Sequence, residues 1–235
     1  MFIFNDFVIK IIIWFSPVIG MYMSSDETIY VVVNCNYFII GLQQLFIDSS
    51  INLRFIDDIL EIDFPHNEMT YILLVLSITN VTLLERFKNT IDFINGINTQ
   101  VKTGILVSEL NAYLTYYLYR KLKRKVTFFN SHNLINGIFK RNVLSWLKGK
   151  TFRPMRVIYR YRDECYGYSL KEWLTLVVPL SGESIKEVSA CLNISEHSLY
   201  QIRTKALKKM RLQTYREFYQ LFINGEMRIE NNKIR

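Results

Sequence analysis

The residues of this chain best suited to recognition chemistry lie between Glu196 and Met210. Apolar side chains recur there at helical spacing and predict a helix with one buried side. They are Leu199, Ile202, Ala206 and Met210. The other positions carry amide, hydroxyl and cationic side chains, namely Ser198, Tyr200, Gln201, Arg203, Thr204, Lys205 and Lys208. Amides and hydroxyls can hydrogen-bond to base edges, and cations attract phosphates, so this face is chemically suited to a nucleic acid.

A shorter helix is expected immediately before this stretch. Ile185, Val188 and Leu192 recur three and four residues apart and form one apolar stripe, starting just after Gly182. Ser195 is placed to cap the following helix, which should begin at the next residue. Two helices joined by a tight turn, the second with a polar and cationic outer face, are typical of a helix-turn-helix that enters the major groove. The alternative is a surface helix hairpin with a solvated lysine face.

Residues 168–212 resemble the C-terminal DNA-binding domain of the LuxR/GerE (NarL/FixJ) family of bacterial regulators. The positions that carry the resemblance are Gly182, Glu187-Val188-Ser189, Ile194-Ser195, Ser198-Leu199 and Lys209-Met210, together with Glu172. The chain departs from the family pattern at Ile202, where a His is usual, and at Thr175, where an apolar residue is usual. Pro179 should also kink the preceding helix.

The resemblance implies a role for each polar residue of the second helix. Tyr200, Gln201 and Thr204 occupy the positions of base-edge contacts, since Gln can pair with adenine and Thr can contact a thymine methyl. The residues expected to hold phosphates are Ser198, Arg203, Lys205 and Lys208. The implied partner is double-stranded DNA, bound by a homodimer or by a heterodimer with another LuxR-type regulator. A helix over 214–223 would close the four-helix domain and is a candidate dimer contact.

The first 150 residues predict alternating strands and helices. The expected strands are 29–33, 53–56, 71–76, 105–107 and 126–129, and the expected helices are 38–46, 83–94, 110–122 and 134–147. Continuous β-branched runs are typical of strands buried on both faces. The alternation predicts an α/β doubly wound, flavodoxin-like domain with five parallel strands. The chain would therefore join this domain to an all-α four-helix LuxR-type helix-turn-helix domain.

This order of elements resembles the receiver domain of response regulators, and the whole layout is similar to Rcs-type auxiliary regulators. The positions that correspond to receiver chemistry are Asn34 and Asn36 for the metal-binding acids, Ser77 for the phosphoacceptor Asp, Ser108 for the hydroxyl residue, and Asn130 in the region of the Lys. Amides and hydroxyls alone bind Mg²⁺ poorly, and an unactivated Ser does not replace the Asp. The resemblance therefore implies a pseudo-receiver that works without phosphorylation.

The charge distribution supports a DNA-binding protein, and the sequence motifs argue against an enzyme. The net charge is +8; residues 151–235 contribute 15 Lys and Arg against 9 Asp and Glu, whereas the first 150 contribute 14 against 12. A basic surplus of this kind favours phosphate backbone. No nucleophile–base pair, phosphate loop or metal cluster stands out, so no cofactor and no metal are expected. The cysteines, Cys35, Cys165 and Cys191, are expected to be reduced and mostly buried in a cytoplasmic protein.

The expected boundaries are 1–23 for an apolar extension, 24–149 for the receiver-like domain, 150–167 for a basic linker, 168–224 for the helix-turn-helix domain and 225–235 for a loose polar tail. The extension could be an upstream start, a weak membrane anchor or an extra packed element; the membrane reading is disfavoured because Lys10 and Pro17 interrupt the apolar run.

Two other hypotheses about the chain remain open. One is a sigma-factor region-4-like protein associated with RNA polymerase, because residues 203–211 also resemble that family. The other is a membrane-anchored helix-turn-helix regulator.

Two features of the region around residue 120 could also contact a partner. The run from Arg120 to Lys125 is strongly basic and is usually a solvated helix end. The helix before it carries tyrosines at positions where receivers commonly dimerise, and burial is expected to account for about half of them. These tyrosines are Tyr113, Tyr116, Tyr117 and Tyr119.

Overall fold

The computed structural model describes residues 27–33, 35–62, 69–75, 81–96, 100–107, 112–122, 126–150, 152, 167–230 and 232–235. The expectations for residues 1–23, and for nearly all of the basic linker, lie outside the described residues. The chain divides into two compact units. One consists of Met1–Leu76, Ile97–Val107 and Val126–Met155; the other of Ser77–Gly96, Ser108–Lys125 and Arg156–Arg235. Across the described ranges, no helix has the length and apolar character needed to span a membrane.

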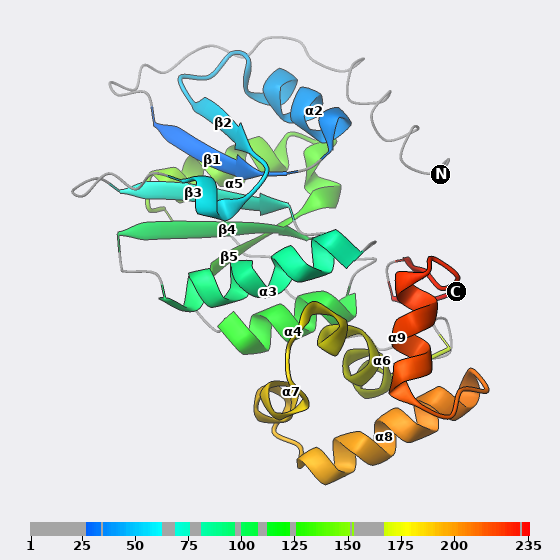
Figure 1. The fold of residues 1–235 in the computed structure, drawn as a ribbon. Coiled ribbons are helices and arrows are strands. Elements are labelled where there is room, and N and C mark those ends of the chain that lie inside the picture. The colour runs from blue at the N-terminus through cyan, green and yellow to red at the C-terminus, as the bar shows by residue number, and fades with distance from the viewer. Residues whose placement is uncertain are drawn as a thin grey trace. The chain divides into compact units, whose positions relative to one another are not determined.

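The first unit contains a parallel five-stranded sheet. Its strands are β1 (Thr28–Val32), β2 (Asn52–Ile56), β3 (Thr70–Val75), β4 (Val101–Val107) and β5 (Val126–Asn130). They lie side by side in the order β2-β1-β3-β4-β5, and each pair is parallel (Figure 1). This order is that of a flavodoxin-like sheet, which confirms the five-stranded prediction. Strand β4 begins earlier than predicted, because Val101 and Lys102 already pair with β3.

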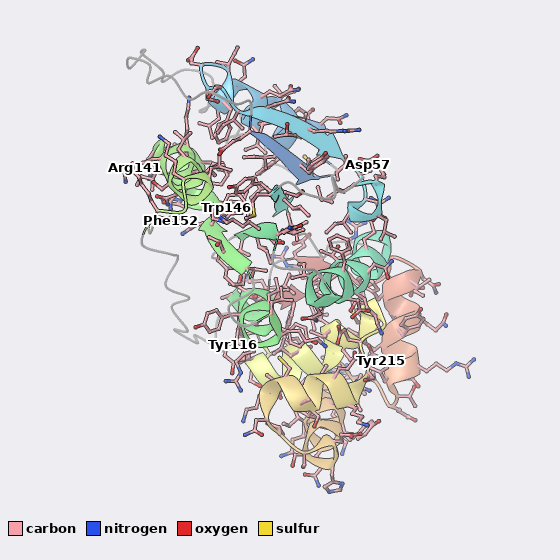
Figure 2. The ribbon with its side chains drawn as sticks, turned by 90° about the vertical axis from the view of Figure 1, so that its left-hand side faces the viewer. Asp57, Tyr116, Arg141, Trp146, Phe152 and Tyr215 are labelled. Atoms are coloured by element: carbon pink, nitrogen blue, oxygen red, sulfur yellow. The ribbon has the colours of Figure 1, made fainter. Side chains whose placement is uncertain are left out.

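Helices α2 (Asn36–Phe46) and α5 (Ile138–Leu147) share one apolar core with alternate residues of the strands. The ring of Phe129 on β5 lies at its centre, with ring centroids 5.6 Å from Phe139, 5.5 Å from Trp146 and 5.4 Å from Phe152. Figure 2 labels Trp146 and Phe152. Gly104 is required on the neighbouring strand, because a Cβ there would lie 2.7 Å from the Phe129 ring.

Helix α5 is shorter than predicted. The sequence predicts a continuous helix over 134–147, but residues Ser131–Leu134 form a 3₁₀ turn and α5 starts only at Ile138. Gly137 has φ +70°, a left-handed conformation that interrupts a right-handed helix. The Asn136 side chain accepts the Ile138 N–H at 3.1 Å, so the break is also capped.

The second unit is helical. It contains α3 (Val81–Gly96), α4 (Ala112–Leu122), α6 (Leu170–Val177), α7 (Ile185–Leu192), α8 (Glu196–Lys209) and α9 (Tyr215–Ile223). Helices α3 and α4 follow strands β3 and β4 in the chain, yet they group with the C-terminal helices. Pro179 acts as expected: α6 ends at Val177 and a 3₁₀ turn, η5 (Val178–Ser181), follows.

The C-terminal tail is ordered, and the prediction of a loose tail is wrong. Strands β6 (Ile229–Glu230) and β7 (Lys233–Ile234) form an antiparallel hairpin. Asn232 between them is fully buried, and its side-chain oxygen accepts the Tyr113 N–H of α4 at 3.1 Å. That N–H is one of the groups at a helix start that have no partner within the helix. The polar composition of these residues suggested a solvated tail. Composition does not reveal a contact with a residue 119 positions earlier in the chain.

Candidate nucleic-acid interface

Helix α7 is defined at both ends by local hydrogen bonds. The Ser184 hydroxyl accepts the Glu187 N–H at 3.2 Å, and the Glu187 carboxylate accepts the Ser184 N–H at 2.6 Å, which together form a capping box. Burial alone would raise the pKa of Glu187, but the bonds from Ser184 and the charges of Lys121 and Lys88 together lower it. The helix ends where Asn193 adopts a left-handed conformation, φ 56°. Val188 is the fully buried residue of the helix.

A short turn connects α7 to α8, which begins at Glu196 as predicted (Figure 1). The Ser195 hydroxyl accepts the Ser198 N–H at 3.2 Å and confirms the predicted cap. The Ser198 hydroxyl lies 2.8 Å from that of Ser195. These bonds define where α8 begins.

The buried side of α8 differs slightly from the predicted stripe. Leu199, Ala206 and Leu207 are buried, whereas Ile202 and Met210 are half-buried. Met210 lies beyond the last helical residue and its N–H donates to Leu207, so the helix ends before Met210 can continue the stripe. Leu207 takes part in the packing instead, a role that the periodic pattern missed.

The opposite side of α8 is an exposed polar stripe. Its members are His197, Tyr200, Gln201, Thr204, Lys205 and Lys208, all of them exposed. Gln201 Nε2 lies 2.9 Å from His197 Nε2, and the Thr204 hydroxyl donates to the Tyr200 carbonyl at 2.9 Å. The structure thus brings the three residues expected at base edges onto one face with Lys205 and Lys208. We call these six residues the outer face of α8.

Arg203 does not belong to the outer face. Its Nε donates to the Thr175 carbonyl of α6 at 3.0 Å, and its guanidinium lies 4.1 Å from the ring centroid of Tyr215 on α9, labelled in Figure 2. Burial lowers the pKa of Arg203, while the two neighbouring tyrosines act in the opposite direction. The side chain therefore ties α8 to α6 and α9, and the sequence, which suggested a phosphate contact, did not indicate this arrangement.

The last turn of α8 is tied to the start of α6. Lys209 Nζ lies 2.7 Å from Glu172 Oε2, and the same carboxylate accepts the Ser169 N–H at 2.8 Å. Burial acts to raise the pKa of Glu172, but the bonds from Lys209 and Ser169 together lower it. Glu172 thus joins two helices through one carboxylate.

Helix α4 holds the loop before α7 through a buried carboxylate. Glu183 is 2% exposed, and its Oε2 accepts the Tyr117 hydroxyl at 3.0 Å and pairs with Lys121 Nζ at 2.8 Å. Burial and the nearby Glu183 charge both raise the pKa of Tyr117. A buried carboxylate is stable only with partners of this kind. No local pattern in the sequence around Glu183 indicates that this carboxylate is buried.

The loop before α7 and the last turn of α7 receive further bonds from α3 and α4. Lys88 Nζ on α3 donates to the Gly182 carbonyl at 3.0 Å, and Arg120 Nε on α4 donates to the Cys191 carbonyl at 3.3 Å. The cation at Cys191 also suits the negative end of the helix dipole. We call these contacts, with those of Glu183, the α4–α7 joint.

Two of the four tyrosines of α4 are buried, as predicted. Tyr113 and Tyr117 are 1% and 0% exposed, whereas Tyr119 is 48% exposed and Tyr116 lies between. Tyr113 packs edge-on against Trp173 with ring centroids 5.9 Å apart, and its hydroxyl donates to the Tyr168 carbonyl at 2.9 Å. The two buried tyrosines therefore belong to the helical core.

Two of the receiver-like positions can be placed. Asn36 is exposed at the first residue of α2, and the Asn130 side chain accepts the His132 N–H at 2.9 Å. Asn34, Ser77 and Ser108 lie outside the described residues. Within the part of the chain that the structure describes, no three His, Cys, Asp or Glu residues gather as metal ligands would.

The cysteines are less buried than predicted. Cys35 is exposed just before α2, because only its backbone takes part in the start of that helix. Cys191 is half-buried, and burial is the main reason that its pKa is raised to about 11. Cys165 lies outside the described residues.

The described residues thus define a protein with a parallel five-stranded sheet and, in its helical unit, two capped helices joined by a short turn. No protein-family profile and no curated protein matches the chain. Among solved structures, the RcsB response regulator of Salmonella typhimurium is similar at 13% identity and a TM-score of 0.44, over 85% of this chain and 98% of that one. RcsB of Salmonella enterica serovar Typhimurium bound to a promoter gives 14% and 0.41, over 85% and 100%. Full-length FixJ of B. japonicum gives 12% and 0.32, over 84% and 96%. These values are too low to carry a conclusion about function.

Proposed function

We propose that this chain is a bacterial transcription regulator that binds double-stranded DNA sequence-specifically through α8. The observation that supports this function best is the outer face of α8: amide, hydroxyl, aromatic and cationic side chains stand exposed on one side of a helix whose other side is buried. An α-helix of this kind fits the major groove, where base edges can be read directly. The buried apolar residues anchor α8 and Ser195 caps its start, so packing does not depend on the outer face.

The proposed roles follow from position on the helix. Tyr200, Gln201 and Thr204 would contact base edges, and Lys205 and Lys208 would contact phosphates that flank them. Ser198, near the start of the helix, would approach a phosphate from the end where backbone N–H groups point outward. Arg203 is left out of the phosphate set, because its guanidinium is engaged with Thr175 and Tyr215.

We also propose that the sheet unit is a pseudo-receiver and that DNA binding does not need phosphorylation. The amides Asn36 and Asn130 are present where carboxylates and a neighbouring lysine would be required, and amides alone do not neutralise Mg²⁺. Incubation with acetyl phosphate and Mg²⁺ should leave the intact mass unchanged. An added phosphoryl group on a side chain of this unit would refute the proposal.

DNA binding is proposed to involve a dimer, either of two copies or with another LuxR-type regulator, in the bacterial cytoplasm. One helix-turn-helix module buries little surface, so paired half-sites are the usual way to reach useful affinity. Helix α9 presents Tyr219 and Ile223, which are 37% and 43% exposed, as apolar side chains available for such a contact. Sedimentation of the protein on selected DNA distinguishes one bound copy from two.

The experiment that tests the DNA-binding proposal is selection from a random duplex library, followed by competition binding. Enrichment of a defined motif would support the assigned role of the outer face. Gln201→Ala should then weaken the sequence preference at about one base pair of that motif. Glu226→Ala, a substitution of an exposed residue after α9, is a matched control that should leave the motif unchanged. Absence of any motif, together with co-purification of core RNA polymerase, would favour the sigma region-4 alternative.

A further inference from the structure

One contact on the outer face of α8 has a defined direction. His197 and Gln201 lie one helical turn apart, both are exposed, and Gln201 Nε2 lies 2.9 Å from His197 Nε2. The amide nitrogen carries two hydrogens and cannot accept a hydrogen bond. The Gln201 amide N–H therefore donates and His197 Nε2 accepts.

This contact leaves the rest of the amide available. Gln201 retains one N–H donor and the Oε1 acceptor, and these two groups match the N7 acceptor and the N6 amino donor of adenine. We infer that His197 is a positioning residue, which orients the Gln201 amide so that its remaining donor and acceptor meet the edge of an adenine. This inference rests on the proposed function, because it assumes that Gln201 faces a base pair.

Two physical effects follow from the bond. A long glutamine side chain loses rotamer freedom when it binds DNA, and a partner on its own helix removes part of that loss beforehand. The partner also fixes which side of the amide holds the nitrogen. Without it, the amide can turn about its terminal bond and exchange donor for acceptor, which weakens the discrimination between adenine and guanine.

The test uses the full chain and the motif obtained by selection, with the base pair that depends on Gln201 replaced by each alternative. His197→Ala should reduce the discrimination for adenine by about three- to tenfold, part of the range that one bidentate contact provides. Binding to random competitor DNA should change less than about twofold, because a positioning role does not alter phosphate contacts. His197→Phe, which keeps an aromatic ring but no acceptor, should behave like His197→Ala.

Two further variants separate positioning from other roles. His197→Gln supplies a side-chain carbonyl acceptor at similar reach and should restore most of the discrimination. In a Gln201→Ala background, His197→Ala should cause no additional loss, because the residue through which it acts is absent. Thermal melting of each variant should match the parent protein, since both side chains are exposed.

The outcomes distinguish the two levels of the argument. If the unmodified protein shows no preference for any duplex, the proposed function fails. If it has a motif but His197→Ala and His197→Phe retain full discrimination at the Gln201-dependent pair, only the positioning role of His197 is overturned. An equal loss of binding to all sequences would also overturn that role, because it would indicate a phosphate contact.

Discussion

The polar side chains around α7 and those on the outer face of α8 are used in opposite ways. Side chains of α3 and α4 hold the loop before α7 and the last turn of α7, and the Glu183 carboxylate in that loop is fully enclosed. The polar bonds within the outer face of α8, by contrast, run between residues of the helix itself. Burial, rather than residue type, therefore separates the polar groups that stabilise the helical unit from those left exposed on α8.

The largest effect is expected at the α4–α7 joint. Glu183→Ala removes the carboxylate that accepts the Tyr117 hydroxyl and pairs with Lys121. The free energy of unfolding should fall by about 2–3 kcal/mol. Urea unfolding followed by circular dichroism measures this loss. The control is Glu226→Ala, an exposed acid with no such role, which should change stability by less than about 0.5 kcal/mol. Equal stability of the Glu183 variant would remove the basis for a special role of the joint.

The next largest effect tests Arg203, which lies on α8 but behaves like the residues of the joint. Arg203→Ala should cost about 1–2 kcal/mol, because the Tyr215 ring loses its cation and the Thr175 carbonyl loses a donor. Arg203→Lys should recover only part of the loss, because an ammonium lacks the planar fork. Thermal melting reports both variants. A variant that melts normally but binds all DNA weakly would instead support a phosphate contact.

The Glu172–Lys209 pair predicts a dependence of stability on pH. The folded pKa of Glu172 is lowered below its ordinary value of 4.5, so the carboxylate stabilises the fold fully above that value and loses its contribution as the pH falls through the folded pKa. The expected loss in the free energy of unfolding is about 0.5–1 kcal/mol. Solvent screens the pair and keeps this loss small, because Lys209 is 47% exposed. Unfolding at pH 6 and pH 3.5 should show a smaller difference for Glu172→Gln than for the parent. An identical difference would contradict the assignment.

The smallest effect is expected on the outer face of α8, and it should appear in binding alone. Lys208→Ala should leave the melting temperature unchanged and weaken binding to specific and random duplexes alike, by roughly three- to fivefold at moderate salt. The slope of log affinity against log salt should fall by about one. Loss of sequence preference in this variant would show that Lys208 reads a base and would weaken the division between base and phosphate contacts.

Local chemistry in the sequence was enough to predict the helices α7 and α8 and the turn between them. Ser195 as a cap, the start of α8 at Glu196 and the end of α6 near Pro179 each depend on residues within one or two turns. The β-branched run at 29–33 and the alternation of apolar strand and helix patterns likewise predicted the five strands. Partners far apart in the chain could not be predicted: the Glu183–Lys121 pair spans 62 residues, and neither residue has a local pattern that indicates burial. The packing of Arg203 could not be predicted for the same reason, since its partners lie on two other helices.

The contact between Asn232 and Tyr113 has a consequence for how the protein is made. Helix α4 leaves the ribosome long before the residue that accepts its Tyr113 N–H, which lies 119 positions further on. Until translation reaches Asn232, that backbone group lacks this acceptor. The helical unit therefore reaches its final form only after synthesis of the hairpin, and a nascent chain stalled at residue 225 should be cleaved near α4 more readily than the released protein.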